Sequence, residues 1–239
     1  MAFLLGLIIG SFFNVVIYRL PRRLSLANPP STCPQCRTRL RPVELIPVLS
    51  YLILQGRCSH CRSPIPWRYP LVELLTGMAF FLLWKGRPGA FIHEALFVSL
   101  LIMLAFIDLE HMVMPNSLTL GGMAGGILLT FFGWGVGPAS SLAGAGLGLG
   151  LIAVIIWASR GGMGLGDAKL LGLIGAFLGP WGAVGALFWG SLAGGLAGVI
   201  LLAGGRMKRQ DPLPFGPFLA LGAVVMLAAG PDLVRWFLG

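Results

Sequence analysis

Eight apolar runs follow one another along this chain of 239 residues, separated by polar segments. A helix needs about 20 residues to cross the ~30 Å hydrocarbon core of a bilayer, and most of the runs approach that length. Hydrophobic residues make up 56% of the chain and charged residues only 10%, which is more apolar surface than a soluble domain of this size can bury. The pattern therefore predicts an all-α, polytopic membrane protein of about eight transmembrane helices, in the runs 1–18, 69–84, 91–107, 117–134, 139–159, 168–180, 181–204 and 214–238.

The run 168–180 is the shortest of the eight, and only Pro180-Trp181 separates it from the run 181–204. Two interpretations of this pair stay open: a tight helical hairpin, or a re-entrant segment that does not cross the bilayer completely. Glycines also recur inside the runs at i, i+4 spacing, where small residues let helix backbones pack closely. We expect such packing at Gly121/Gly125, Gly144/Gly148 and Gly190/Gly194/Gly198.

Basic residues are distributed unevenly between the loops. Nine of the 17 Lys and Arg lie in 19–68, where Glu44 is the only acid. With the N-terminus outside, the cytosolic segments and Lys169 at the membrane edge hold 14 of the 17, in agreement with the positive-inside rule. The first run lacks the basic start and the small-residue cleavage site of a signal peptide, so we expect it to remain as a helix. The predicted domains are a first transmembrane helix (1–18), a cytosolic loop domain (19–68) and a membrane bundle (69–239).

All the cysteines of the chain lie in the 19–68 loop, as two C-x-x-C pairs. Two such pairs supply the four soft ligands of a tetrahedral, closed zinc site, and a loop of this size needs a staple to fold. Unbound thiols, or a redox-active or disulfide pair, are the alternatives, although disulfides rarely persist in the cytosol. His60 could also replace one thiol. The loop is therefore predicted to carry structural zinc on Cys33, Cys36, Cys58 and Cys61.

Two of the eight acidic residues lie at the ends of apolar runs. Asp108 ends one run, and Asp167 begins another after the glycine-rich segment 161–166. Ionisable groups at membrane depth are costly and usually functional, and two adjacent carboxylates can share a proton and hold a water between a base and an acid. Helix caps or interface residues are the structural alternatives. Among the other acids, Glu94 and Glu110 are rivals for the catalytic role, and Glu73 is a secondary candidate for lining the same cavity.

The motifs around these residues are similar to those of the bacterial type 4 prepilin peptidases, the bifunctional enzymes of type IV pilus and type II secretion systems. The resemblance runs nearly end to end, through the segments 10–21, 44–51, the second C-x-x-C pair, 68–73, 108–116, 164–169 and 214–222. The G-x-G-D sequence that ends at Asp167 also resembles that of the presenilin-type intramembrane proteases. Several such motifs in order are far more specific than a lone G-x-G-D.

The resemblance implies an aspartic endopeptidase of the bacterial inner membrane. It would remove the basic leader of prepilins or pseudopilins after a glycine, at the cytosolic membrane face. Asp108 and Asp167 would be the catalytic pair, and the residues that shape the site or bind substrate would be Gly164, Gly166, Lys169 and Glu73. Membrane lipids, rather than the equally basic leader, are the expected partners of the loop arginines.

The resemblance also implies that the enzyme methylates the new N-terminal amine, using S-adenosylmethionine as the methyl donor. No glycine-rich cofactor fingerprint marks the donor site in the sequence. The methyl-transfer candidates are the polar residues of the first loop and its flanks, Asn14, Arg19 and Glu44, with Glu44 as a possible proton acceptor. A surface ion pair between Glu44 and a nearby arginine is the alternative.

Two other classes of protein share parts of this pattern. A transporter or channel could use the paired carboxylates as a proton relay, with a loop that is merely zinc-stapled, but the chain shows no internal repeat of the kind that transporters have. A membrane-anchored nucleic-acid binder is disfavoured, because Tyr51 and Trp67 are few aromatics for a stacking platform. We therefore expect no nucleic-acid partner.

Overall fold

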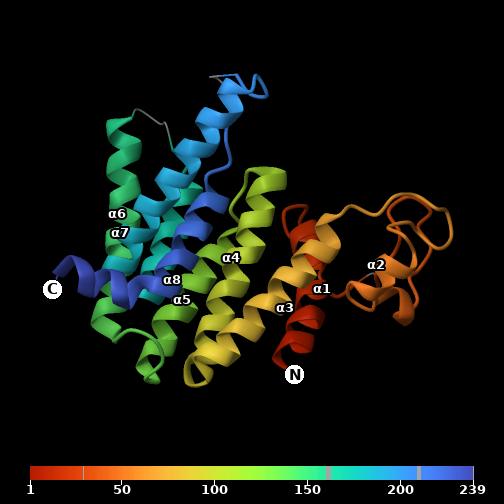
Figure 1. The fold of residues 1–239 in the computed structure, drawn as a ribbon, viewed down its shortest axis with the longest axis horizontal. Helices are drawn as coiled ribbons and strands as arrows, with labels where there is room; N and C mark the ends of the chain where they lie inside the picture. The colour runs from red at the N-terminus through yellow and green to blue at the C-terminus, as the bar shows by residue number, and fades with distance from the viewer. Residues whose placement is uncertain (29, 160–162, 209–210, 239) are drawn as a thin grey trace. The chain divides into compact units, whose positions relative to one another are not determined.

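The computed structural model describes residues 1–28, 30–159, 163–208 and 211–238. The regular elements in these ranges are all helices. No β-strand is present among the described residues, which have only two isolated β-bridges, both in the loop domain. It divides into two compact units, Met1–Ala95 and Leu96–Gly239, which are traced in Figure 1. The all-α prediction is confirmed. Residues 160–162, which include the start of the glycine-rich segment 161–166, lie outside the described residues.

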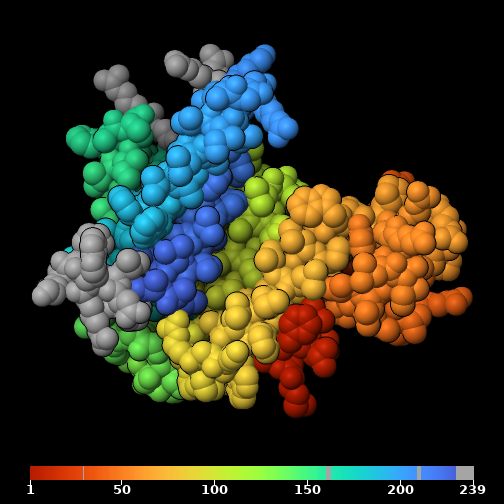
Figure 2. All heavy atoms as spheres, viewed as in Figure 1, coloured from red at the N-terminus to blue at the C-terminus, as the bar shows by residue number. Residues whose placement is uncertain are grey.

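The N-terminal unit consists of two long helices and the loop domain. Helix α1 (Ala2–Arg19) packs against α3 (Arg68–Gly86), and α4 begins in this unit. Gly6 and Gly10 of α1 make this packing close, since a Cβ at Gly10 would lie 2.8 Å from Glu73 Cα. The loop domain holds the short helices η1 (Pro42–Leu45) and α2 (Leu49–Ile53), and η2 (Pro88–Ala90) follows α3. Figure 2 shows the loop domain as a lobe beside these two helices.

The C-terminal unit is a bundle of apolar helices. It contains most of α4 (Phe91–His111), then α5 (Asn116–Phe131), α6 (Pro138–Ala158), α7 (Leu165–Ala203) and α8 (Gly216–Leu238). The core includes the stacked rings of Phe97 and Phe177, whose centroids are 4.8 Å apart. The last turn of α4 and the first turn of α8 lie at the same end of this bundle (Figure 1).

Helix α7 turns back on itself at the break that the sequence predicts. Gly179 has φ 74° and ψ −175°, and Pro180 follows it; only glycine adopts such a conformation readily. Gly194, in the second arm, contacts Phe215 and Phe218 at the start of α8, where Asp108 also lies. Asp167 is near Asp108 as well. A straight helix from Asp167 to Gly194 would be about 40 Å long, so α7 is a hairpin of two arms.

The glycine prediction is right for some of the pairs. A Cβ at Gly144 would lie 2.2 Å from Gly175 O, one at Gly148 would lie 2.4 Å from Leu171 O, and Gly190 similarly contacts α8. The prediction is wrong for Gly121, Gly125 and Gly198, which have open space where a Cβ would stand. Spacing alone does not tell which face of a helix meets a neighbour.

Four helices in the described residues are long and apolar enough to cross a membrane. They are Ala2–Arg19, Pro88–His111, Pro138–Ala158 and Leu165–Ala203. The chain is thus a membrane protein of several spanning helices, and the number eight stays a prediction. The first arm of α7 is about 22 Å long at 1.5 Å per residue, which is shorter than the ~30 Å bilayer core.

Candidate active site, metal centre and cavity

Four thiols meet in the loop domain of the N-terminal unit. The Sγ atoms of Cys33, Cys36, Cys58 and Cys61 all lie within 4.8 Å of one another, and those of Cys33 and Cys61 are 3.8 Å apart. A tetrahedral zinc ion with Zn–S bonds of ~2.3 Å requires S–S separations of ~3.8 Å. The four thiols are therefore spaced to hold one tetrahedral ion.

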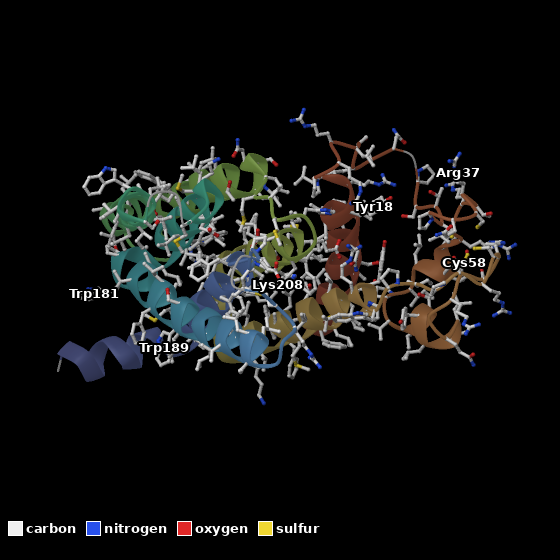
Figure 3. The ribbon with its side chains drawn as sticks, turned by 90° about the horizontal axis from the view of Figure 1, so that it is seen from above. Tyr18, Arg37, Cys58, Trp181, Trp189 and Lys208 are labelled. Carbon is white, nitrogen blue, oxygen red and sulfur yellow. The ribbon has the colours of Figure 1, made fainter. Side chains whose placement is uncertain are left out.

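The two cysteine pairs lie in turns of the same geometry. Arg37 N–H donates to Cys33 O at 2.9 Å, and in the second turn Arg62 N–H donates to Cys58 O at 3.0 Å. Both arginines have φ 58°, a left-handed conformation that reverses the chain. Each turn therefore aims its two thiols at a common point, and Figure 3 shows Cys58 inside this lobe with Arg37 at its surface.

The electrostatics of Cys33 suit a metal ligand. Burial raises the pKa of this thiol, but the backbone N–H groups of Cys36 and Gln35 outweigh that effect and bring the pKa to about 6. The thiolate is the form that binds metal. His60 is turned toward Glu44, with Nε2 3.8 Å from the Glu44 carboxylate, and it is not part of the thiol cluster.

A cavity of about 420 Å³ lies between the loop domain and the helices α1 and α3. Small-molecule sites typically have volumes of about 300–1,000 Å³. The lining includes Tyr18 and Cys58, which Figure 3 labels on α1 and in the loop domain. It also includes all three methyl-transfer candidates from the sequence, Asn14, Arg19 and Glu44, together with Glu73.

Glu44 is held by the loop domain itself. Its carboxylate accepts a hydrogen bond from Arg41 N–H at 2.6 Å and another from the Ser59 hydroxyl. These two donors, the backbone N–H first, lower the pKa of Glu44. These two hydrogen bonds fasten η1 to the second cysteine turn. The charge of Arg41 also acts on the carboxylate, so pairing with an arginine stays an open interpretation.

Glu73 and Asn14 lie on the two long helices of this unit, α3 and α1. Glu73 is 7% exposed, and its carboxylate accepts a hydrogen bond from Val48 N–H at 2.7 Å. Asn14 is 2% exposed, and its amide donates to Tyr69 O at 3.0 Å. Both side chains line the cavity of the N-terminal unit. The polar groups that α1 and α3 contribute to the cavity thus include a carboxylate and an amide.

Asp108 lies in the last turn of α4 in the C-terminal unit, and its side chain is buried against α8. It is 7% exposed, and its Oδ2 accepts a hydrogen bond from Gly216 N–H at 2.9 Å. Gly216 is the first residue of α8. The free N–H groups at a helix N-terminus stabilise a nearby carboxylate.

Asp167 lies in the first turn of α7, close enough to Asp108 for the two carboxylates to interact electrostatically. Its Oδ2 accepts a hydrogen bond from Gly164 N–H at 3.3 Å, which caps the helix. The capping role that was an alternative to catalysis is thus present, and it fixes the carboxylate beside its partner. Two distant motifs therefore converge, as the sequence predicts.

Met114 and Lys169 complete the surroundings of the pair. A Cβ at Gly166 would lie 2.7 Å from Met114 Cγ, and one at Gly216 would lie 2.4 Å from Met114 Cε. Met114 thus packs against a glycine beside each aspartate. Lys169 Nζ donates to Asn116 Oδ1 at 2.8 Å, which ties the start of α7 to the start of α5. Gly166 and Lys169 accordingly have structural contacts that shape the site.

The rival acids have other contacts. Glu110 lies 3.9 Å from the imidazole of His111. Glu94, near the start of α4, forms an ion pair of 3.0 Å with Arg87. Sequence reasoning missed the hydrogen bond from Gly216, although the segment 214–222 was among the motifs. A glycine between two prolines at a helix start was the available signal.

Comparisons with known proteins cover the whole chain. Residues 4–86 match the bacterial peptidase A24 N-terminal domain, and residues 95–199 match the type IV leader peptidase family. The prepilin leader peptidase/N-methyltransferase of Aeromonas hydrophila is 37% identical over 100% of this chain and 93% of its own. The proteins of the same name from Bacillus subtilis and Myxococcus xanthus are 35% and 42% identical, over 99% and 90% of this chain and 96% and 68% of their own. No solved structure matches.

Proposed function

This chain belongs to the type IV leader peptidase family, and from that premise we propose that Asp108 and Asp167 cleave its substrates as one catalytic pair. The protein is a prepilin leader peptidase that also N-methylates the new N-terminus. The observation that carries the proposal is the approach of a buried carboxylate, Asp108, and a half-buried one, Asp167, from separate helices, α4 and α7, at one end of the bundle. We infer that this end faces the cytosol, in agreement with the distribution of Lys and Arg.

In the proposed cleavage, the two aspartates share one proton. The ionised carboxylate takes a proton from a water between them, and the water attacks the carbonyl carbon of the scissile bond. The protonated carboxyl donates its proton to the carbonyl oxygen, and the amine of the mature chain leaves with a proton. Gly216 N–H holds Asp108 in position, while Gly164, Gly166 and Lys169 keep the start of α7 in place.

We further propose that the four cysteines hold one structural Zn²⁺. The S–S spacing and the lowered pKa of Cys33 support this assignment. The ion would contribute folding energy to a loop that has little apolar core of its own. With four protein ligands it would have no open position for substrate.

The methyl-donor site, on this account, is the cavity of about 420 Å³ beside the zinc loop. Its size suits a ligand such as S-adenosylmethionine. Asn14, Arg19 and Glu44 contribute to it in different ways. Asn14 joins α1 to α3, because its amide donates to Tyr69 O. Arg19 donates to Ser25 O at 2.9 Å. Glu44 joins η1 to the second cysteine turn of the loop. Glu44 is thereby a residue that shapes the cavity.

One experiment tests the pair of activities together. The purified protein in lipid is incubated with a prepilin and S-adenosylmethionine, and the products are analysed by mass spectrometry. We expect a shortened pilin that carries one additional methyl group on its N-terminal amine. An unprocessed prepilin would contradict the peptidase assignment, and a shortened but unmethylated product would contradict the methyl-donor site. A prepilin and a pseudopilin are both proposed as substrates.

Gly216→Ala is expected to reduce prepilin cleavage by about 100-fold, because displacing a catalytic group by about 1 Å has an effect of that size. The added Cβ would lie 2.7 Å from Asp108 Oδ2 and 2.4 Å from Met114 Cε, so the carboxylate has to move. Initial rates with one prepilin check this.

Gly198→Ala is the matched control, because this glycine has open space where a Cβ would stand. It should cleave at the rate of the unchanged protein. A Gly216→Ala protein as active as this control would show that Asp108 does not depend on its contact with α8.

A further inference from the structure

The cavity of the N-terminal unit contains a buried carboxylate, Glu73, that takes no part in the proposed cleavage or in metal binding. Glu73 lies on α3 opposite Gly10 of α1, and a Cβ at Gly10 would lie 2.8 Å from Glu73 Cα. This close approach places Glu73 at the junction of α1 and α3. A carboxylate in such a position is expensive to bury and needs a specific reason to be there.

Asn14 supplies a second unusual group beside it. The Asn14 amide N–H donates to Tyr69 O, but Asn14 Oδ1 is buried and has no hydrogen-bond partner among the described residues. Leaving a buried acceptor without a donor costs about 1–3 kcal/mol. A ligand that brings N–H groups into the cavity would remove that cost.

The contacts of Glu73 leave it able to act on such a ligand. Val48 N–H and the Ser11 hydroxyl donate to its carboxylate. Both donors are neutral, so the carboxylate has no cationic partner among these contacts. An ammonium group would supply the missing charge, and a primary ammonium carries three N–H donors.

The other carboxylate of the cavity is placed differently. Glu44 belongs to the loop domain and is engaged by Arg41 N–H, the Ser59 hydroxyl and the neighbouring His60 ring. These contacts favour its charged form and fix it to the loop. The hydrogen bonds from Arg41 N–H and the Ser59 hydroxyl lower the pKa of Glu44, so its carboxylate is a poor proton acceptor.

We propose that Glu73 and Asn14 form the site that receives the N-terminal ammonium of the cleaved pilin, and that Glu73 accepts its proton before methyl transfer. The proposal rests on the methyl-donor cavity of the proposed function. The proton passes from the ammonium to the Glu73 carboxylate, which leaves a neutral amine. Its lone pair forms the new N–C bond to the methyl group of S-adenosylmethionine, while the C–S bond breaks and its electron pair goes to sulfur. The products are the methylated ammonium and S-adenosylhomocysteine, and Glu73 releases its proton to water.

Glu73→Gln tests the role of the carboxylate with little change of shape. Its amide oxygen can still accept from Val48 N–H, but the group cannot take a proton. The substrate is a synthetic peptide of the mature pilin N-terminus, so methylation is measured without prior cleavage. We expect methylation at neutral pH to fall by about 100-fold, the size of a general-base contribution. The loss should shrink as the pH rises past the amine's own pKa of about 8, because the solvent then removes the proton.

Three comparisons make the result decisive. Glu73→Asp should restore part of the activity, because it returns a carboxylate. Glu44→Gln should reduce the methylation rate by the same factor at every pH, as expected for a residue that acts through the fold of the loop. Calorimetric binding of S-adenosylmethionine to the unchanged protein tests the cavity itself.

If S-adenosylmethionine does not bind the unchanged protein, the methyl-donor site of the proposed function is wrong. If it binds and Glu73→Gln methylates like the unchanged protein at every pH, the role of Glu73 alone is wrong. A loss in Glu73→Gln that is the same at every pH would likewise overturn the proposal, because it would mark a purely structural contact.

Discussion

Replacing Asp167 with asparagine is expected to reduce prepilin cleavage by at least about 1,000-fold, within the range that general acid–base groups contribute. Asparagine keeps the shape of the side chain and can still accept the hydrogen bond from Gly164 N–H, but it cannot exchange a proton. Asp108→Asn should have the same effect. Its amide oxygen can still accept the hydrogen bond from Gly216 N–H, but the side chain cannot exchange a proton. The measurement is the initial rate of leader removal from a prepilin in lipid.

Glu110→Gln is the matched control for these two variants. It removes a carboxylate that lies two positions from Asp108 on the same helix and 3.9 Å from the His111 ring. Cleavage should stay within about twofold of the unchanged protein, since surface ion pairs contribute little. Thermal melting verifies that all three variants are folded. Substantial cleavage by either asparagine variant would remove that aspartate from the mechanism.

Removal of one of the four thiolates is the second change with a large expected effect, on the zinc content and on the fold of the loop domain. The unchanged protein should contain one Zn²⁺ per chain, and Cys58→Ser should contain almost none, because a structural site needs all four ligands. The loop domain should then lose its fold, since its two cysteine turns are joined through the metal. Methylation should fall below detection, because Cys33 and Cys58 both line the proposed methyl-donor cavity.

Elemental analysis, together with hydrogen exchange over residues 30–65, measures both consequences of Cys58→Ser. The membrane helices should retain their protection, because α1 and α3 pack through glycine contacts that do not involve the loop. His60→Ala should retain the metal, since this side chain is turned toward Glu44. A metal-free protein with an ordered loop would refute the zinc assignment.

The sequence predicted the helices well because each of them is long and apolar. The run 69–84 became α3 (Arg68–Gly86), and the run 139–159 became α6 (Pro138–Ala158). The break at Pro180-Trp181 was also visible, since proline interrupts helical hydrogen bonding. Whether the break forms a hairpin was not, because that depends on contacts of the second arm with α8. The eight crossings and the domain division 1–18, 19–68 and 69–239 stay predictions.

The site residues divide in the same way. Cys33, Cys36, Cys58 and Cys61 could be grouped from spacing, because a C-x-x-C turn is a local structure. Asp108 and Asp167 were found from their positions at the ends of apolar runs. The hydrogen bond from Gly216 N–H to Asp108, which joins residues 108 positions apart, could not be found in this way. No local pattern records which backbone N–H groups meet a carboxylate after folding.

The same limit applies to the cavity. Asn14, Arg19 and Glu44 were selected from the sequence only as polar groups near the first loop. Their common cavity arises because α1 and α3 pack closely at Gly10 and the loop folds beside them. Glu73 lines this cavity of the N-terminal unit, and its expected place beside the aspartates stays a prediction. The sequence shows that Glu73 lies about one turn into α3, but it does not show which surface the side chain faces.

The central claim is that Asp108 and Asp167 act as one unit on the scissile bond. The most direct test is the affinity of a prepilin leader peptide whose scissile amide is replaced by a hydroxyethylene group, which places a hydroxyl where the attacked carbonyl would be. Transition-state analogues bind about 10²-fold or more tighter than substrates when the catalytic groups are complementary to them. The affinity is measured for the unchanged protein, Asp108→Asn, Asp167→Asn and the double variant, with the ordinary amide peptide as reference.

We expect the analogue to bind the unchanged protein at least about 100-fold more tightly than the amide peptide. Each single variant should lose this advantage, and the double variant should lose no more than either single one, because residues that act as a unit are not additive. Binding of the amide peptide should be similar in all four proteins. An analogue that binds all four proteins equally well, or losses that add in the double variant, would contradict the account.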